Sequence, residues 1–142
     1  MIFLTVSVLA LSFPGCGKKE NTSDRTLRVG IVTYTQDDPF INTMTEQIRE
    51  DLKLKESKDM KILVSVKNGD NDQRDQDELV EEMIAAGCDV LCVNLVDRTA
   101  PSDIIKAARQ EKIPVIFFNR EPVKEDLMQW DKLYYVGCDA EQ

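Results

Sequence analysis

The sequence predicts an α/β fold: a doubly wound parallel sheet with helices on both faces, the three-layer α/β/α arrangement of a Rossmann-type lobe. Two observations predict it. Apolar, β-branched runs alternate along the chain with segments whose apolar residues recur at helical spacing. The first run, Leu27–Thr33, suits a strand buried on both faces of a parallel sheet. The chain has 142 residues, 42% of them apolar, which suffices for a single core.

The first predicted helix follows a polar turn and begins at Pro39, because proline is favoured as the first residue of a helix. Its apolar residues form one stripe at spacings of three and four, and the charged residues between them are expected to face water. The stripe consists of Ile41, Met44, Ile48 and Leu52, and the charged face of Glu46, Arg49, Glu50 and Lys53.

The same alternation continues to the end of the chain. A strand over Lys61–Val66 leads through a polar loop, residues 68–72, into a helix that Gly87 ends. The inward side of that helix comprises Leu79, Val80, Met83 and Ile84. The later elements are a strand over Val90–Asn94, a helix over Ser102–Gln110 with Ile104, Ile105 and Ala108 inward, and strands over Pro114–Asn119 and Leu133–Gly137. Five strands alternating with helices imply right-handed crossovers.

The N-terminus has a different character. Ile2–Phe13 is an uncharged apolar run that would rise only about 18 Å as a helix, too short to span a bilayer. It is typical of a secretory signal, so residues 1–15 are predicted to be a signal peptide and the mature protein extracytoplasmic. Residues 16–25 are polar and are expected to form a flexible tether.

Cys16 closes the string Phe-Pro-Gly-Cys, which resembles the lipobox of bacterial lipoproteins. In such proteins the signal is removed and the cysteine becomes a lipid-bearing N-terminus, anchored to the outer face of the cell membrane. Two features depart from that pattern: Phe13 stands where leucine is usual, and no lysine or arginine precedes the apolar run. The alternative is cleavage by ordinary signal peptidase, with no part for Cys16.

Composition excludes several function classes. The net charge is −8, which repels phosphate, so no nucleic-acid partner is expected. The chain has no histidine, which excludes Ser/His/Asp and Cys/His triads and any metal site that needs imidazole. No Cys-x-x-Cys motif occurs among the cysteines after Cys16, which are Cys88, Cys92 and Cys138. Cys88 and Cys92 are interpreted as buried small hydrophobic residues.

Doubly wound sheets bind ligands outside the carboxyl ends of their strands, and here those ends carry carboxylates, carboxamides and one aromatic ring. Neither G-x-G-x-x-G nor G-x-x-x-x-G-K occurs, so nucleotides lack their usual loop. Carboxylates accept from hydroxyls, amides donate and accept, and an aromatic face packs on the C–H face of a sugar ring. A neutral, hydroxyl-rich ligand such as a sugar therefore suits this edge. The residues are Asp37, Asp38, Phe40, residues 68–72, Asn94, Asp97, Asn119, Arg120 and Glu121.

Several strings resemble the periplasmic D-galactose/D-glucose-binding proteins, which are periplasmic binding proteins of type I. They lie at residues 29–34 with 37–40, 71–73, 93–97, 113–122 and 134–137, within a resemblance over about residues 26–140. The resemblance implies that residues 26–142 form the N-terminal sugar-binding lobe of a substrate-binding lipoprotein. Such a protein binds D-galactose or D-glucose between two lobes, delivers it to the permease of an ABC importer, and is not an enzyme.

The resemblance implies three sugar-binding residues. Asp38 would hydrogen-bond one hydroxyl, Phe40 would stack on one face of the sugar, and Asn119 would hydrogen-bond another hydroxyl. A structural interpretation competes for each: Asp38 as the cap of the helix, Phe40 as part of the core, and Asn119 as a turn former at a strand end. Arg120 is a lesser candidate, because the galactose type has lysine there while related ribose binders use an arginine on the ligand.

The resemblance also implies a second lobe. Family members close two lobes on the sugar, and residues 134–139 match the first crossing between them, so the chain is expected to be a fragment that binds sugar weakly. The family's calcium loop belongs to the second lobe, so neither a metal nor another cofactor is expected here. Asn94 and Asp97 match the family but are assigned to loop structure.

Three other functions share some of these features. A transcription regulator of this fold would need a helix-turn-helix before residue 26, where the sequence has an apolar leader. A metal-dependent enzyme would rest on Asp70, Asp72 or Asp97, although acidic loops of this kind are usually solvated surface. The extracytoplasmic sugar-sensing domain of a signalling receptor would share the whole lobe, and it is the alternative function.

Overall fold

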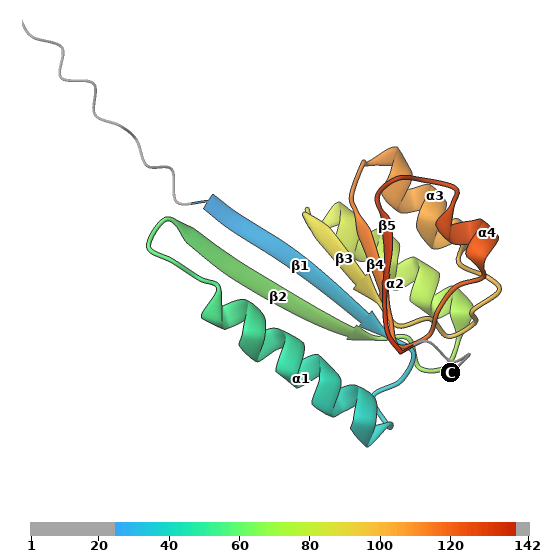
Figure 1. Cartoon of the computed structure of the whole chain (residues 1–142), viewed down its shortest axis with the longest axis horizontal. Coiled ribbons are helices and arrows are strands. Elements are labelled where there is room, and N and C mark those ends of the chain that lie inside the picture. The colour runs from blue at the N-terminus through green and yellow to red at the C-terminus, as the bar shows by residue number, and fades with distance from the viewer. Residues whose placement is uncertain (1–24, 139–142) are drawn as a thin grey trace, which may run out of the picture.

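A computed structural model describes residues 25–138 and confirms the doubly wound parallel sheet. Five parallel strands lie in the order β2-β1-β3-β4-β5 (Figure 1). Their bounds are β1 Arg25–Thr33, β2 Met60–Asn68, β3 Val90–Val93, β4 Val115–Phe118 and β5 Leu133–Val136. Each predicted strand is present, with ends that differ by a few residues from those expected.

The helices form two layers, one on each face of the sheet. Their bounds are α1 Pro39–Leu54, α2 Gln73–Ala85, α3 Ser102–Gln110 and α4 Lys124–Leu127. α1 lies on one face, and α2 and α3 lie together on the other (Figure 1). The short helix α4 was not predicted, because four residues are too few to show a helical period.

Alternation along the strands divides the core between the two faces. Val29 and Ile31 of β1 belong to the cluster that packs under α1, whereas Val32 belongs to the cluster under α2 and α3. Gly30 faces the second cluster, and a Cβ there would stand 2.9 Å from the Cys88 Sγ. The three-layer architecture therefore follows from the two-residue period of the strands.

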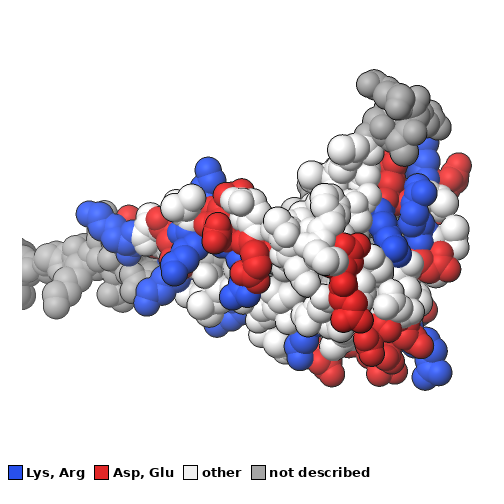
Figure 2. Space-filling view, turned by 90° about the horizontal axis from the view of Figure 1, so that it is seen from below, with Lys and Arg blue, Asp and Glu red and all other residues white. Residues whose placement is uncertain are grey.

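Helix α1 confirms its predicted pattern. Ile41 is buried, Met44, Ile48 and Leu52 pack against the sheet, and the four predicted charged residues are exposed. Acidic and basic side chains are interspersed on the face seen in Figure 2. Gly87 ends α2 as predicted: it has a φ of 81°, a left-handed conformation that glycine adopts freely.

Cys88 and Cys92 are buried free thiols, as predicted, whereas Cys138 is exposed. Burial raises the pKa of the Cys92 thiol to about 11 and also raises that of Cys88. Because the thiolate is the reactive form, burial and a raised pKa both disfavour reaction of these two thiols. They act as small hydrophobic residues of the core.

The edge strands are less covered than the central ones. β1 and β2 pair over nine residues, from Arg25 opposite Met60 to Thr33 opposite Asn68, while β3 pairs with β1 only at residues 29–32. The two long strands therefore extend beyond the others as a ribbon (Figure 1).

On β5, Tyr134 and Val136 are exposed on the side of the sheet that carries α1. Burial on both faces thus holds for the C-terminal half of β1 and for β3, and not for the edges.

The predicted signal peptide, the lipid-bearing Cys16 and most of the tether lie outside the described residues. Of the predicted tether, only Arg25 is described, and it is the first residue of β1. Among residues 25–138, the helices are all too short or too polar to cross a membrane.

Candidate functional site

The candidate site lies along the carboxyl edge of the sheet, where all five parallel strands end (Figure 1). The strand order reverses between β1 and β3, so the loops that follow these strands diverge to opposite faces. Asp38 and Phe40 follow β1, and Asn119 follows β4. The predicted residues therefore lie on either side of the end of β3, at the switch point where ligands of such sheets bind.

Asp38 caps helix α1, as the structural interpretation predicted. Its Oδ1 accepts a hydrogen bond from the Phe40 backbone N–H at 2.8 Å. Its Oδ2 accepts one from the Tyr34 hydroxyl at 2.7 Å. These two bonds hold the pKa of Asp38 below its ordinary value, and the bond from Tyr34 has the larger effect. An ionised carboxylate has about four acceptor positions, so capping leaves positions for a ligand hydroxyl.

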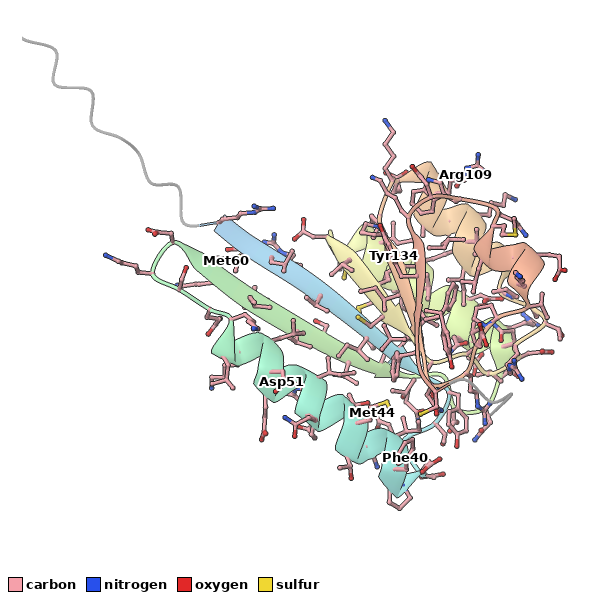
Figure 3. The ribbon with its side chains drawn as sticks, in the orientation of Figure 1. Phe40, Met44, Asp51, Met60, Arg109 and Tyr134 are labelled. Atoms are coloured by element: carbon pink, nitrogen blue, oxygen red, sulfur yellow. The ribbon has the colours of Figure 1, made fainter. Side chains whose placement is uncertain are left out.

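The interpretation of Phe40 as a core residue is wrong. The residue is 60% exposed at the first turn of α1, at the end of the helix that lies toward the carboxyl ends of the strands (Figure 3). The buried stripe of the helix starts one residue later, at Ile41, because the helical turn carries Phe40 off the inward face. An aromatic residue therefore faces solvent two positions after Asp38.

Asn119 forms the turn that ends β4. Its φ is 61°, a left-handed conformation that asparagine tolerates better than most residues. Its backbone N–H donates to the Val136 carbonyl at 3.1 Å, and its carbonyl accepts from the Tyr135 hydroxyl at 3.2 Å. The turn interpretation is confirmed, and the backbone bonds leave the half-buried side chain on the carboxyl edge.

Sequence reasoning missed Tyr34, which lies between two of the candidate residues. Its hydroxyl donates to Asp38, and the guanidinium of Arg120 lies 3.7 Å from its ring centroid. The Arg120 Nη1 also donates to the carbonyls of Leu95 and Val96, at 3.2 and 3.0 Å. Arg120, predicted as a lesser sugar ligand, is therefore engaged with the protein itself.

The loop after β3 is held by two glutamines at the start of α2. Gln76 is fully buried, donates to the Asn94 carbonyl at 3.0 Å and accepts from the Val96 N–H at 3.0 Å. Gln73 accepts from the Asp97 N–H at 2.9 Å. The Asn94 amide is also buried and donates to the Phe118 carbonyl at 3.1 Å. Asn94 and Asp97 thus have the loop role that the sequence assigned to them.

We expect Gln76→Leu to lower the free energy of unfolding by about 2 kcal/mol, because it leaves the buried Asn94 carbonyl and the half-buried Val96 N–H without partners. Urea unfolding followed by circular dichroism measures the change. Gln47→Leu, at an exposed position of α1, is the matched control and should shift stability by less than about 0.5 kcal/mol. Equal effects of the two substitutions would contradict the role given to Gln76.

Two of the three acidic residues considered for a metal have local roles. Asp72 caps α2 by accepting from the Arg74 and Asp75 N–H groups, and Asp97 accepts from the N–H and hydroxyl of Thr99. Nowhere in residues 25–138 do three or more cysteine, aspartate or glutamate side chains gather as a metal site would require. The structure therefore does not bring Asp70, Asp72 and Asp97 together as metal ligands.

The fold and this edge define a class of protein: an α/β lobe that presents polar side chains and an aromatic ring at the switch point of a parallel sheet. A model of the periplasmic binding protein domain matches residues 29–142, and the chain belongs to this family. It is a family of binding proteins rather than enzymes.

The relatives of the chain include sugar-binding proteins. It is 32% identical over 115 residues to the D-galactose/methyl-galactoside binding periplasmic protein of Haemophilus influenzae, a match covering 81% of this chain and 34% of that protein. It is 28% identical, with a TM-score of 0.63, to a carbohydrate transporter solute binding protein from Chloroflexus aurantiacus in complex with D-glucose, covering 81% of this chain and 31% of that one.

A third comparison concerns the fold alone. The fructose binding periplasmic domain of a hybrid two component system matches with a TM-score of 0.65 and 24% identity, over 80% of this chain and 34% of that one. The chain spans about a third of the length of the first curated relatives it matches, 34% and 39%.

Proposed function

We propose that the chain is the N-terminal sugar-binding lobe of a substrate-binding lipoprotein that serves an ABC importer, with D-galactose or D-glucose as ligand. The observation that carries the proposal is the exposed Phe40 at the start of α1, whose backbone N–H donates to the Asp38 carboxylate. An aromatic face left in water costs free energy, and a sugar ring that covers it recovers that cost. The adjacent carboxylate would accept from a hydroxyl of the same sugar.

Asn119 extends the proposed site to the other side of the β3 end. Its carboxamide can both donate and accept, so it suits a hydroxyl that does the same. The ligands named for two relatives, D-galactose or methyl-galactoside and D-glucose, support a hexose. In a two-lobed protein of this kind, a second lobe would close over the sugar, exclude water and present the closed form to the permease.

Titration of the ¹⁵N-labelled protein with D-galactose, D-glucose and D-ribose into the millimolar range tests the proposal, because chemical shifts report even weak binding. We expect saturable shifts of the backbone amides of Phe40, Ile41 and Asn119 with a hexose. Ribose serves as the pentose comparison and should bind more weakly. Saturable shifts that avoid the carboxyl edge, or none with either hexose, would contradict the proposal.

Attachment to the membrane through Cys16 is a further part of the proposal. It rests on the apolar leader and on the small residue that precedes the cysteine. Labelling of cells with a palmitate analogue should mark the wild-type protein and not Cys16→Ser. Cys138→Ser, which removes an exposed cysteine elsewhere, is the matched control and should retain the label.

The alternative function, the sugar-sensing domain of a signalling receptor, would use the same site. The likeness to the periplasmic domain of a two component system supports it only at the level of the fold. Association separates the two functions: an importer component should cross-link to a permease subunit in membranes when sugar is added. Cross-linking to a sensor kinase instead would favour the alternative.

A further inference from the structure

A continuous network of contacts crosses the carboxyl edge and consists of Arg120, Tyr34 and Asp38. Arg120 lies in the turn after β4 and is anchored to the loop after β3 by its bonds to Leu95 and Val96. Its guanidinium stacks on the Tyr34 ring, which follows β1. The Tyr34 hydroxyl then reaches the Asp38 carboxylate. This network of contacts thus joins the ends of three neighbouring strands, β1, β3 and β4.

We propose that Tyr34 and Arg120 are positioning residues for sugar binding: together they hold the Asp38 carboxylate in one orientation and do not themselves contact the sugar. The inference rests on the proposed function, because it takes Asp38 as a sugar ligand. It assigns roles to one residue that sequence reasoning missed and to another that it offered as a ligand.

The geometry at Asp38 supports this assignment. The Phe40 N–H holds Oδ1 and the Tyr34 hydroxyl holds Oδ2, so both oxygens are fixed and the carboxylate does not rotate freely. Each oxygen keeps an acceptor position for a ligand hydroxyl. A carboxylate fixed before the sugar arrives loses less conformational freedom on binding, which raises affinity.

The contacts of Arg120 explain why it acts through Tyr34. Its Nη1 protons are used on two backbone carbonyls, and the Tyr34 ring lies against its planar face. Arginine is suited to this double role, because its guanidinium stacks on aromatic rings while its N–H groups donate in the plane.

The state of the Tyr34 hydroxyl agrees with a donor role. Its hydrogen bond to Asp38 is the main cause that raises the pKa of Tyr34 above its ordinary value, and partial burial adds to it. The hydroxyl therefore keeps its proton throughout the neutral range. The same bond is the main cause that lowers the pKa of Asp38.

Tyr34→Phe is the central test, because it removes the hydroxyl and keeps the ring on which Arg120 stacks. We expect hexose affinity to fall about tenfold, because the variant loses one hydrogen bond to a charged group. This bond affects the sugar only indirectly, through the orientation of Asp38. The pKa of the Asp38 carboxyl, followed by ¹³C NMR, should rise toward its ordinary value. Tyr134→Phe, which removes an exposed hydroxyl on β5, is the matched control and should change neither quantity.

Arg120→Met tests the second residue. Its effect on affinity should be smaller than, or equal to, that of Tyr34→Phe, and the double variant should lose little more than Tyr34→Phe alone, because both residues act through Asp38. Losses that add in the double variant would overturn the inference, since they would show that Arg120 acts by a route other than Asp38. Unchanged affinity in Tyr34→Phe would overturn it as well.

The Asp38 pKa keeps this test separate from that of the proposed function, because the titration needs no sugar. A raised Asp38 pKa in Tyr34→Phe, in a protein that binds no hexose, would refute the proposed function and leave the Tyr34 contact to Asp38 established. An unchanged Asp38 pKa in a protein that binds hexose would refute the positioning role and leave the proposed function intact.

Discussion

Phe40→Ala should weaken hexose binding about 30-fold while leaving the stability of the fold unchanged to within about 0.5 kcal/mol. Phe40 is 60% exposed, so removal of its ring opens no cavity in the core. Its contribution arises only when a sugar covers it, and burial of a phenyl ring contributes about 2 kcal/mol. Chemical-shift titration measures the affinity, and urea unfolding measures the stability.

Leu54→Ala provides the matched control for Phe40. Leu54 is also a large exposed apolar residue of α1, 82% exposed, but it lies at the other end of the helix, away from the carboxyl edge. It should change neither affinity nor stability appreciably. A Phe40→Ala protein with wild-type affinity would show that the ring takes no part in binding, whereas a large loss of stability would contradict its exposed position.

Asp38→Ala should lower both stability and hexose affinity, whereas Asp38→Ser should lower affinity with a smaller loss of stability. Alanine removes the helix cap, at a cost of about 1 kcal/mol, together with the sugar acceptor. Serine can still cap α1 by accepting from the helix N–H groups, but its side chain is shorter and carries no charge. With either substitution we expect affinity to fall by about 20-fold or more, because a charged acceptor is lost.

The comparison of the two variants separates the two roles of Asp38. Equal losses of stability in Asp38→Ser and Asp38→Ala would mean that the cap is not the stabilising contact. Full affinity in Asp38→Ser would mean that the carboxylate only caps the helix. Asp72→Ser, at the corresponding cap of α2, is a control that should leave affinity unchanged.

The pH dependence of Asp38 follows from its lowered pKa. Folding lowers that pKa below its ordinary value of 3.8, so the ionised carboxylate stabilises the fold above pH 3.8. This contribution is lost as the pH falls through the lowered value. Hexose affinity, which needs the same ionised form, should therefore stay constant from neutral pH down to the ordinary value and decrease only below it.

Local patterns predicted most of the fold and the position of the candidate site. Ile41 and Met44 marked the inward face of α1, Gly87 marked the end of α2, and polar residues after each strand marked the binding edge. The Asp38 cap was predictable because capping depends on neighbours only a few residues away. Phe40 could not be placed from the same pattern, because it adjoins the apolar stripe and only the helical turn decides which way it faces.

By itself, the sequence determined the order of strands and helices, the parallel sheet and the edge at which polar side chains gather. These features depend on periodicity and on neighbouring residues, which can be read along the chain. Only the tertiary structure decided that β1 lies between β2 and β3, that Arg120 stacks on Tyr34, and that Gln76 holds the loop after β3. The two side-chain contacts join residues far apart in the chain and leave no local pattern, because they exist only once the crossovers have brought the strand ends together.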